Sequence, residues 1–237
     1  MSSPAYRRIL LKLSGEVLSG EQNFGIDPSK ATQLANEIKS VREIGVEIGL
    51  IIGAGNIFRG IQAASKGMDR VTGDYLGMLA TIMNAISVQD ALEVVGVETR
   101  TLSAIKVSQI AEPYIRRRAL RHLEKGRVVI VAGGTGNPYF TTDTAAALRA
   151  TELKAEVLLK GTKVDGVYDK DPVVHSDAVR FDEISFKEVL NQNLRVMDLT
   201  AVTLCKENDL PIQVFDINRA GDLKQVVLGK NIGTTVR

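Results

Sequence analysis

The stretch Ala132–Asp143, which reads AGGTGNPYFTTD, decides the fold. The apolar run Val128–Val131 precedes it and an alanine-rich segment follows, so the predicted order is buried strand, glycine-rich turn and helix. The three glycines would bring bare backbone N–H groups to the carboxyl edge of a sheet. Thr141 or Thr142 is predicted to cap the helix, with Asp143 in the first turn, where the helix dipole favours an anion. An ordinary strand–turn–helix connection is the alternative, although it would not require two threonines, two aromatic rings and an aspartate.

Apolar runs and amphipathic segments alternate along the chain, which predicts a largely parallel sheet covered by helices on both faces. The expected strands are Arg8–Leu13, Val46–Ile52, Val97–Leu102, Arg127–Val131, Glu156–Lys160, Ile212–Phe215 and Thr234–Val236. The expected helices are one that begins at Asp27-Pro28 and ends at Gly45, followed by Thr72–Glu93, Pro113–Lys125, Ser185–Asn191, Thr200–Asn208 and Ala220–Leu228. We expect a turn-rich, hairpin-like stretch at Gly161–Tyr168, a surface loop at Asp169–Arg180 and a soft boundary near Glu152–Glu156.

The segment Thr72–Glu93 has apolar residues on more than one face of the predicted helix. An all-round apolar helix is usually buried, either in a large core or in a contact between subunits. We favour the subunit contact.

The composition excludes several classes of protein. The net charge is +2, the hydrophobic fraction is 44% and the charged fraction is 24%, so nothing favours nucleic acid or a membrane surface as a partner. No apolar run approaches the length of a membrane span, and the N-terminal residues lack the apolar region of a signal peptide. Cys205 is the single cysteine, expected in the core, and no disulfide or structural zinc site can form. A reducing, cytoplasmic compartment is the simplest location.

Glycine-rich turns follow several of the predicted strands, at 12–15, 53–56 and 160–162 as well as at 132–143. The carboxyl ends of parallel strands line one crevice, so backbone donors, Lys12 and Lys160 are expected to converge there. Each lysine follows apolar strand residues, where a charge is costly unless an anion receives it. Two such lysines suit phosphoryl transfer, whose catalysis consists mostly of positioning and charge neutralisation. An edge-strand or outward-pointing lysine is the alternative for Lys12.

Other motifs narrow the chemistry. No P-loop, protein-kinase signature or complete dinucleotide-binding fingerprint is present. Arg59 follows the second glycine turn and could grip a phosphate, unless it is merely solvated. Asp74 is either a carboxylate at a helix N-terminus or an acceptor for sugar hydroxyls. The arginines at 116–118 and Arg121 form a charge run that is most simply a solvated helix face.

In these motifs the chain resembles the bacterial uridylate kinases (UMP kinases) of the amino acid kinase family over essentially its whole length. The motifs are LLKLSGE (10–16), IIGAGNIFRG (51–60), GDYLGMLAT (73–81), GTGNPYFTTD (134–143), KGTKVDGVYDKDP (160–172) and VMDLTA (196–201). The resemblance implies a three-layer α/β/α sandwich with a largely parallel central sheet. It implies one domain, residues 1–237, with a UMP-binding lobe of about 1–152 and an ATP-binding lobe of about 153–237. The implied reaction transfers the γ-phosphoryl group of ATP to UMP, giving UDP and ADP.

The resemblance also assigns site residues. Its catalytic positions are Lys12, Asp143, Lys160 and Arg59, with Asp143 orienting the lysines. Its ATP positions are Lys12, Leu13, Ser14, Gly15, Gly55, Arg59, Thr162, Tyr168 and Asp171. Its UMP positions are Ala54, Asp74, Thr135, Gly136, Asn137, Pro138, Tyr139, Phe140, Thr141 and Thr142. Mg²⁺ is expected to arrive with ATP rather than in a cage of protein ligands.

Members of the family are usually cytoplasmic homohexamers of pyrimidine nucleotide biosynthesis, inhibited by UTP and often activated by GTP. The positions that match the GTP-linked ones are Gly20, Glu21, Gln22, Asn23, Phe24, Gly25, Arg100 and Arg127. Two other functions stay open from sequence: an amino acid kinase that acts on a carboxylate or carbamate, and a nucleotide-binding protein without catalysis. The acceptor loop and Asp74 speak against the first, and the presence of Lys12, Lys160 and Asp143 speaks against the second. The sequence does not fix UMP over CMP or dUMP.

Overall fold

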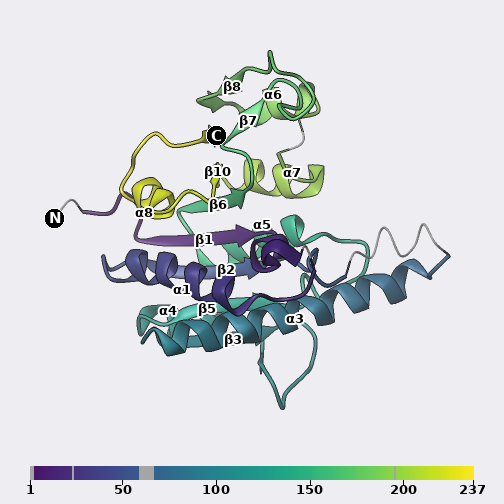
Figure 1. Cartoon of the computed structure of the whole chain (residues 1–237), viewed down its shortest axis with the longest axis vertical. Coiled ribbons are helices and arrows are strands. Elements are labelled where there is room, and N and C mark those ends of the chain that lie inside the picture. Colours follow the sequence, from purple (N-terminus) through teal and green to yellow (C-terminus); the bar gives the residue numbers. More distant parts are fainter. Residues whose placement is uncertain (1–2, 23, 59–66, 195) are drawn as a thin grey trace.

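The computed structural model describes residues 3–22, 24–58, 67–194 and 196–237. Within these residues its centre is one sheet with the strand order β4-β3-β5-β2-β1-β6-β10-β11-β9. Figure 1 shows the middle of this order, from β3 through β5, β2, β1 and β6 to β10. Its strands are β1 (Arg8–Leu13), β2 (Glu47–Ile52), β3 (Thr99–Ser103), β4 (Glu112–Pro113), β5 (Val128–Ala132), β6 (Val157–Thr162), β9 (Glu183–Ile184), β10 (Ile212–Asp216) and β11 (Thr234–Val236). Neighbouring strands are parallel except β10 and β11, which are antiparallel. The predicted largely parallel sheet is confirmed.

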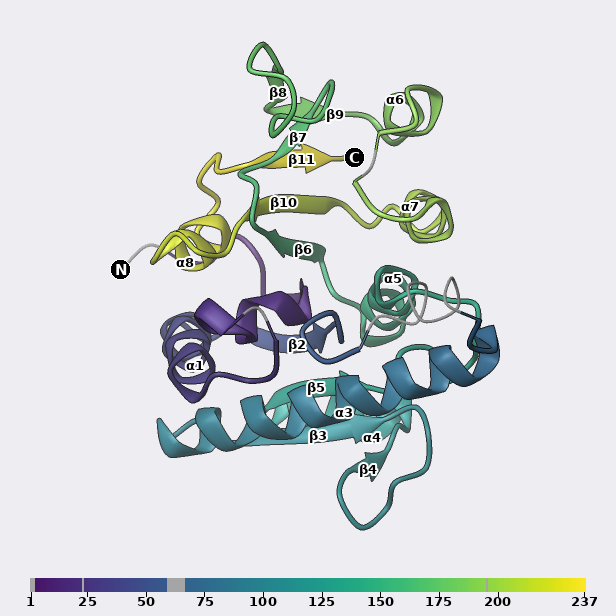
Figure 2. The same ribbon diagram turned by 45° about the vertical axis from the view of Figure 1, so that its right-hand side comes forward.

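Helices cover both faces of this sheet. One core cluster joins the sheet to α1 (Pro28–Arg42), α3 (Arg70–Val94) and α8 (Asp222–Val227). The other cluster joins it to α4 (Arg116–Glu124), α5 (Thr142–Leu153), α6 (Phe186–Asn191) and α7 (Leu199–Glu207). Figure 2 shows α1 and α8 on one side of the sheet and α5 and α7 on the other. The arrangement is the predicted three-layer α/β/α sandwich.

Local capping explains where several helices begin. Asp27 is the N-cap of α1, its carboxylate accepts from the Ser29 N–H at 2.8 Å, and Pro28 occupies the first turn, as the sequence predicted. Ser185 and Glu188 form a capping box at the start of α6.

Cys205 lies in the core within α7, as expected. Burial raises the pKa of its thiol to about 12, so the thiol stays protonated at neutral pH.

Most predicted boundaries lie within two residues of the observed ones, but some elements differ more or were not predicted. The helix expected from Pro113 begins at Arg116, because Glu112 and Pro113 pair with β3 as the edge strand β4, where a proline without an N–H is tolerated. The expected surface loop 169–180 ends in β8 (Arg180–Phe181), which pairs antiparallel with β7 (Val167–Tyr168). The two-residue strand β9 was not predicted, since two residues are too short for a recognisable period. Two short 3-10 helices, Gly15–Leu18 and Gly20–Gln22, follow β1.

Helix α3 is a single 25-residue helix with two apolar faces. Ile82, Val88 and Leu92 are buried in the core cluster that joins α3 to the sheet. The opposite face exposes a row of large apolar side chains, which we call the α3 outer face: Tyr75, Leu76, Leu79, Met83 and Ile86. Soluble monomers rarely expose a contiguous apolar row of this kind.

The register between β1 and β6 sets the site. Lys12 lies directly opposite Lys160, and Leu10 lies opposite Leu158. Side chains alternate between the faces of a strand, so both lysines share the face of Leu10 and Leu158, which is covered by α5. The predicted convergence of the two lysines at one sheet edge is therefore confirmed.

A buried pair of amides supports the turn after β2. The Asn56 and Asn84 side chains exchange hydrogen bonds of 2.9 and 2.8 Å, and both residues are at most 1% exposed. Asn84 also donates to the Gly53 carbonyl at 2.7 Å, and Asn56 donates to the Gly25 carbonyl at 2.7 Å. Helix α3 is thereby fixed to the glycine turn at the carboxyl edge of the sheet.

Replacing Asn84 with leucine should lower the free energy of unfolding by at least about 2 kcal/mol, because the buried Asn56 side chain loses both of its bonds to Asn84 and keeps only the one to Gly25, and the Gly53 carbonyl loses the Asn84 donor. Urea unfolding followed by circular dichroism measures the change. Asn36→Leu is the matched control, since the Asn36 amide bonds a carbonyl on the exposed face of α1. Equal losses for the two variants would contradict a special role for the buried pair.

Candidate active site

An ion triad lies at the carboxyl edge of the sheet. Asp143, in the first turn of α5, places Oδ1 2.7 Å from Lys12 Nζ and Oδ2 3.0 Å from Lys160 Nζ. The three side chains are each at least 84% buried. One carboxylate thus lies between two ammonium groups, and the triad has a net positive charge that suits an anionic ligand.

The surroundings shift the pKa values of the triad. Burial alone would raise the pKa of the Asp143 carboxyl, but the charges of Lys12 and Lys160 outweigh burial, so the pKa lies below its ordinary value. Burial lowers the pKa of the Lys160 ammonium; the Asp143 charge opposes this shift and the Lys12 charge adds to it. The pKa of Lys160 is therefore lower than that of an ordinary lysine.

Asp198, to which the sequence analysis gave no role, supports this triad from α7. It is the N-cap of α7, accepts from the hydroxyl of Thr141, and accepts from that of Thr144 at 2.9 Å. Lys160 also donates to the carbonyl of Val196. The VMDLTA motif therefore joins α7 to the start of α5 and to Lys160, a role that could only be read from contacts distant in sequence.

The glycine-rich turn is built as expected. Thr141 caps α5 by accepting from the N–H groups of Asp143 and Thr144. Gly133 has φ +77°, and a Cβ there would lie 3.2 Å from the backbone nitrogens of Ala104 and Ile105, so glycine is required. Tyr139 also has a positive φ, which is unusual for an aromatic residue and marks a tight turn.

A smaller cavity of about 160 Å³ opens beside this turn. It is lined by six of the predicted UMP positions, Ala54, Asp74, Thr135, Phe140, Thr141 and Thr142. The remaining predicted positions, Gly136, Asn137, Pro138 and Tyr139, lie in the same loop outside this lining.

Asp74 lines this cavity, and two neighbouring groups fix its carboxylate by hydrogen bonds. Its carboxylate accepts from Arg70 Nε at 2.9 Å and from the Tyr139 N–H at 2.7 Å. A carboxylate has about four acceptor positions, so capacity remains for a further hydroxyl. Arg70, which also lines the cavity, was not predicted, because its position one turn before Asp74 shows only once the helix is known to begin at Arg70.

A larger cavity of about 610 Å³ is lined by residues of the C-terminal half of the chain, from Lys160 to Val214. Lys160 and three of the predicted ATP positions, Thr162, Tyr168 and Asp171, line it. Gln192, Asn193, Leu194 and Val196 form the facing wall and were not predicted.

The other predicted ATP positions lie close to the triad but outside that lining. Leu13, Ser14 and Gly15 follow Lys12, and Ser14 caps the first 3-10 helix. A Cβ on Gly15 would lie 2.5 Å from the Gly53 carbonyl oxygen, so the turns after β1 and β2 touch through glycine. Gly55 lies in the turn after β2. Arg59 lies outside the described residues.

The predicted GTP-linked positions fall in two separate places within one chain. Gly20, Glu21 and Gln22 form the second 3-10 helix, and Gly25 bonds to Asn56 at the carboxyl edge of the sheet. Phe24 is exposed, and Asn23 lies outside the described residues. Arg100 lies near the start of β3 and Arg127 just before β5, at the opposite edge. Arg127 pairs with Glu98 at 2.9 Å, and Arg100 with Glu93 at 3.7 Å.

The part of the chain that the structure describes contains no group of three or more His, Cys, Asp or Glu side chains placed to hold a metal ion. In the same residues, no helix combines the length and apolar character needed to span a bilayer.

Comparison with known proteins supplies the family. Residues 7–216 match the amino acid kinase family model. The UMP kinase from Bacillus anthracis is 37% identical with a TM-score of 0.95, over 98% of this chain and 96% of that one. The UMP kinase from Ureaplasma parvum is 38% identical with a TM-score of 0.91, over 97% and 98%. The uridylate kinase from Archaeoglobus fulgidus is 28% identical with a TM-score of 0.75, over 97% and 99%. By its fold, its sequence and its family match, this chain belongs to the amino acid kinase family.

Proposed function

We propose that the protein is a UMP kinase, which transfers the γ-phosphoryl group of ATP to UMP and releases UDP and ADP. The observation that carries the proposal is the buried triad of Lys12, Asp143 and Lys160 with a cavity next to each of two members: Lys160 lines the larger cavity, and Thr142, the neighbour of Asp143, lines the smaller one. A site that joins two nucleotides needs a binding pocket on each side of a positive centre, and this arrangement supplies both. The similarity to UMP kinases supports UMP as the acceptor.

Each part of the site receives a role in this proposal. The larger cavity takes the base and ribose of ATP, and the smaller cavity takes UMP, with Asp74 accepting from the ribose hydroxyls. Lys12 and Lys160 neutralise the negative charge of the phosphoryl group during its transfer, while Asp143 holds the two lysines in place. From the resemblance, Arg59 assists at the phosphates, and the lobes are about 1–152 for UMP and about 153–237 for ATP.

Magnesium enters this reaction as part of the substrate, the Mg²⁺–ATP complex. Mg²⁺ usually keeps several waters and binds through substrate phosphates rather than through an all-protein cage. The only carboxylate between the lysines among the described residues is Asp143, and both of its oxygens face ammonium groups. The protein residues therefore contribute positioning and charge, and the ion contributes further neutralisation of the phosphates.

The resemblance to UMP kinases also supports a proposal for the location, assembly and regulation of the enzyme. The enzyme would act in the cytoplasm, in pyrimidine nucleotide biosynthesis, as a homohexamer inhibited by UTP and activated by GTP. The α3 outer face supports the assembly, since it exposes five large apolar side chains in a row.

The substrate is tested by ADP release from Mg²⁺–ATP with UMP, CMP, dUMP and AMP offered separately. UMP should give fast turnover and AMP none. Turnover of aspartate or a glutamate derivative without turnover of UMP would favour a different amino acid kinase. Tight ATP binding without any turnover would favour a protein that only binds nucleotides.

Asp143→Asn should reduce kcat at saturating substrates on the order of 100-fold, as the loss of a preorganised electrostatic group does. The physical reason is that the two ammonium groups then repel each other without the carboxylate between them. The control is Glu124→Gln, which removes the charge of a carboxylate paired with Arg121 at 3.3 Å on the exposed surface, outside the lining of both cavities. An unchanged kcat in Asp143→Asn would remove the triad from the mechanism.

The pH dependence follows from the lowered pKa of Lys160. The charge that neutralises the phosphoryl group is lost as the pH rises through this pKa, so kcat/KM should fall on the alkaline side below about 10.4, the ordinary lysine value. A pH series of kcat/KM for Mg²⁺–ATP measures it, with protein stability checked at each pH. A flat profile up to that pH would show that Lys160 is not needed in its charged form.

Leu79→Glu with Met83→Glu should dissociate the assembly, because each change buries a charge in the apolar contact proposed for the α3 outer face. Sedimentation velocity gives the mass in solution. Val174→Glu, which places the same charge on another exposed apolar side chain, serves as the control. An unchanged mass in the double variant would mean that subunits meet elsewhere.

A further inference from the structure

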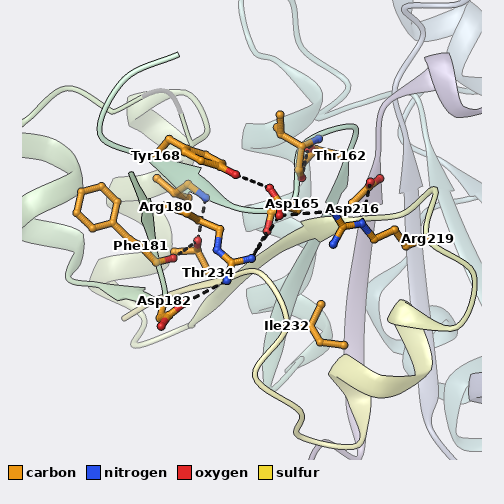
Figure 3. Close-up of polar contacts among 12 residues, drawn as sticks. Thr162, Asp165, Tyr168, Arg180, Phe181, Asp182, Asp216, Arg219, Ile232 and Thr234 are labelled. Atoms are coloured by element: carbon orange, nitrogen blue, oxygen red, sulfur yellow. Dashed lines mark hydrogen bonds and ion pairs between the residues drawn. The ribbon is translucent and has the colours of Figure 1, made fainter. Parts of the chain in front are cut away.

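A polar cluster stands behind the wall of the larger cavity, centred on Asp165 (Figure 3). The Asp165 carboxylate accepts from the Tyr168 hydroxyl at 2.6 Å. It also pairs with Arg180 Nη1 at 3.4 Å and with Arg219 Nη2 at 3.6 Å. The carboxylate therefore joins the turn after β6, strand β7, strand β8 and the turn after β10.

Asp165 does not line the cavity, but its neighbours do. Thr162, Val164, Val167 and Tyr168 all face the cavity. The Thr162 hydroxyl closes the turn that carries Asp165, accepting from the Val164 N–H at 2.8 Å. Any change at Asp165 would therefore act on bound nucleotide through the residues that form this wall.

The wall of the larger cavity is closely packed around Gly166, the residue after Asp165. A Cβ on Gly166 would lie 2.6 Å from the Thr234 hydroxyl oxygen and 2.7 Å from Arg180 Cδ. The buried Thr234 hydroxyl accepts from the Val167 N–H at 2.8 Å and donates to the Phe181 carbonyl. Strands β7 and β8 are thus held against β11, and the Arg180 side chain packs over Gly166 on its way to Asp165 and Asp182.

Asp165 is the residue on which the charges of this cluster converge. Arg180 contacts Asp165 with one nitrogen and Asp182 with the other, at 3.2 Å, and Arg219 lies between Asp165 and Asp216. The Tyr168 hydrogen bond is the main cause that lowers the pKa of Asp165, followed by lesser influences that include both arginines, so the group is a carboxylate at neutral pH. The same hydrogen bond raises the pKa of Tyr168.

We propose that Asp165 is a positioning residue for the ATP side of the site: it fixes Tyr168 and holds β8 and the turn after β10 in the arrangement that shapes the larger cavity. The inference rests on the proposed function, since it takes the larger cavity as the ATP site. It assigns to Asp165 an effect on ATP binding that is separate from phosphoryl transfer and from UMP binding.

The test is Asp165→Asn, which keeps the size of the side chain and removes its charge. The Kd of Mg²⁺–ATP, from titration calorimetry, should rise about tenfold, because the neutral amide no longer holds the two arginines, and Tyr168 in the cavity wall, as firmly. The KM for ATP should follow, while kcat and the KM for UMP stay within about twofold. Asp182→Asn is the matched control, since Asp182 pairs with the same arginine from a largely exposed position, and it should leave the Kd unchanged.

A second readout separates positioning from general loosening of the fold. With ¹³C-labelled tyrosine, the ring-carbon NMR signal of Tyr168 should titrate at a lower pH in Asp165→Asn than in the parent protein, because the neighbouring negative charge is gone. Arg180→Gln removes the partner instead of the carboxylate and should raise the Kd in the same direction. The double variant should then be no weaker than Asp165→Asn alone.

The outcomes separate this inference from the proposed function. An ATP Kd within twofold of the parent value in Asp165→Asn, or an equal loss of kcat and of affinity for both nucleotides, would overturn the positioning role. If the parent protein binds ATP but does not phosphorylate UMP, the proposed function fails, while the calorimetric comparison of the two variants still decides the role of Asp165.

Discussion

The ion triad of Lys12, Asp143 and Lys160 joins the central sheet to helix α5 at the edge where the glycine turns meet. Breaking a buried charge pair by removing one partner typically costs about 3–5 kcal/mol, so such a triad persists only in a structure that fixes all three side chains. The register of β1 and β6 fixes the lysines as neighbours, and the Thr141 cap fixes the first turn of α5, which carries the aspartate. Most features of the site can be understood as supports for these three groups.

Those supports come from both layers of helices. On one side, Asn84 of α3 holds the turn after β2. The Thr81 hydroxyl of the same helix accepts a hydrogen bond from the Gly133 N–H. On the other side, Asp198 at the start of α7 accepts from two threonines of α5. Helix α3 supplies several residues of the smaller cavity, and the C-terminal half of the sheet supplies much of the larger one. Because α3 also carries the exposed apolar face, one helix links the proposed subunit contact to the proposed UMP site.

The sequence predicted the parts of this structure that follow from local patterns. The lysines after apolar strand residues, the threonine cap and the proline at the start of α1 each depend on a few neighbouring residues. Asp198, Arg70, Asn84 and Asp165 escaped prediction because their partners lie in other elements or, for Arg70, because a helix boundary had to be known first. The start of α4 was misplaced for a similar reason: Pro113 is compatible with a first helical turn, and only its pairing with Ser103 makes it a strand residue. The role of Arg59 rests on its place after the glycine turn and on resemblance, and that of Asn23 on resemblance alone, since both residues lie outside the described part of the chain.

The most direct test of the triad's proposed role is a crystal structure with Mg²⁺–ADP, UMP and aluminium fluoride, which imitates the phosphoryl group between donor and acceptor. The account predicts that the aluminium fluoride group lies between the two nucleotides. Lys12 Nζ and Lys160 Nζ should both lie within about 3 Å of its fluorine atoms, and Asp143 should still contact both lysines. A fluoride bound away from the lysines, or lysines that stay paired to Asp143 and do not reach it, would contradict the account.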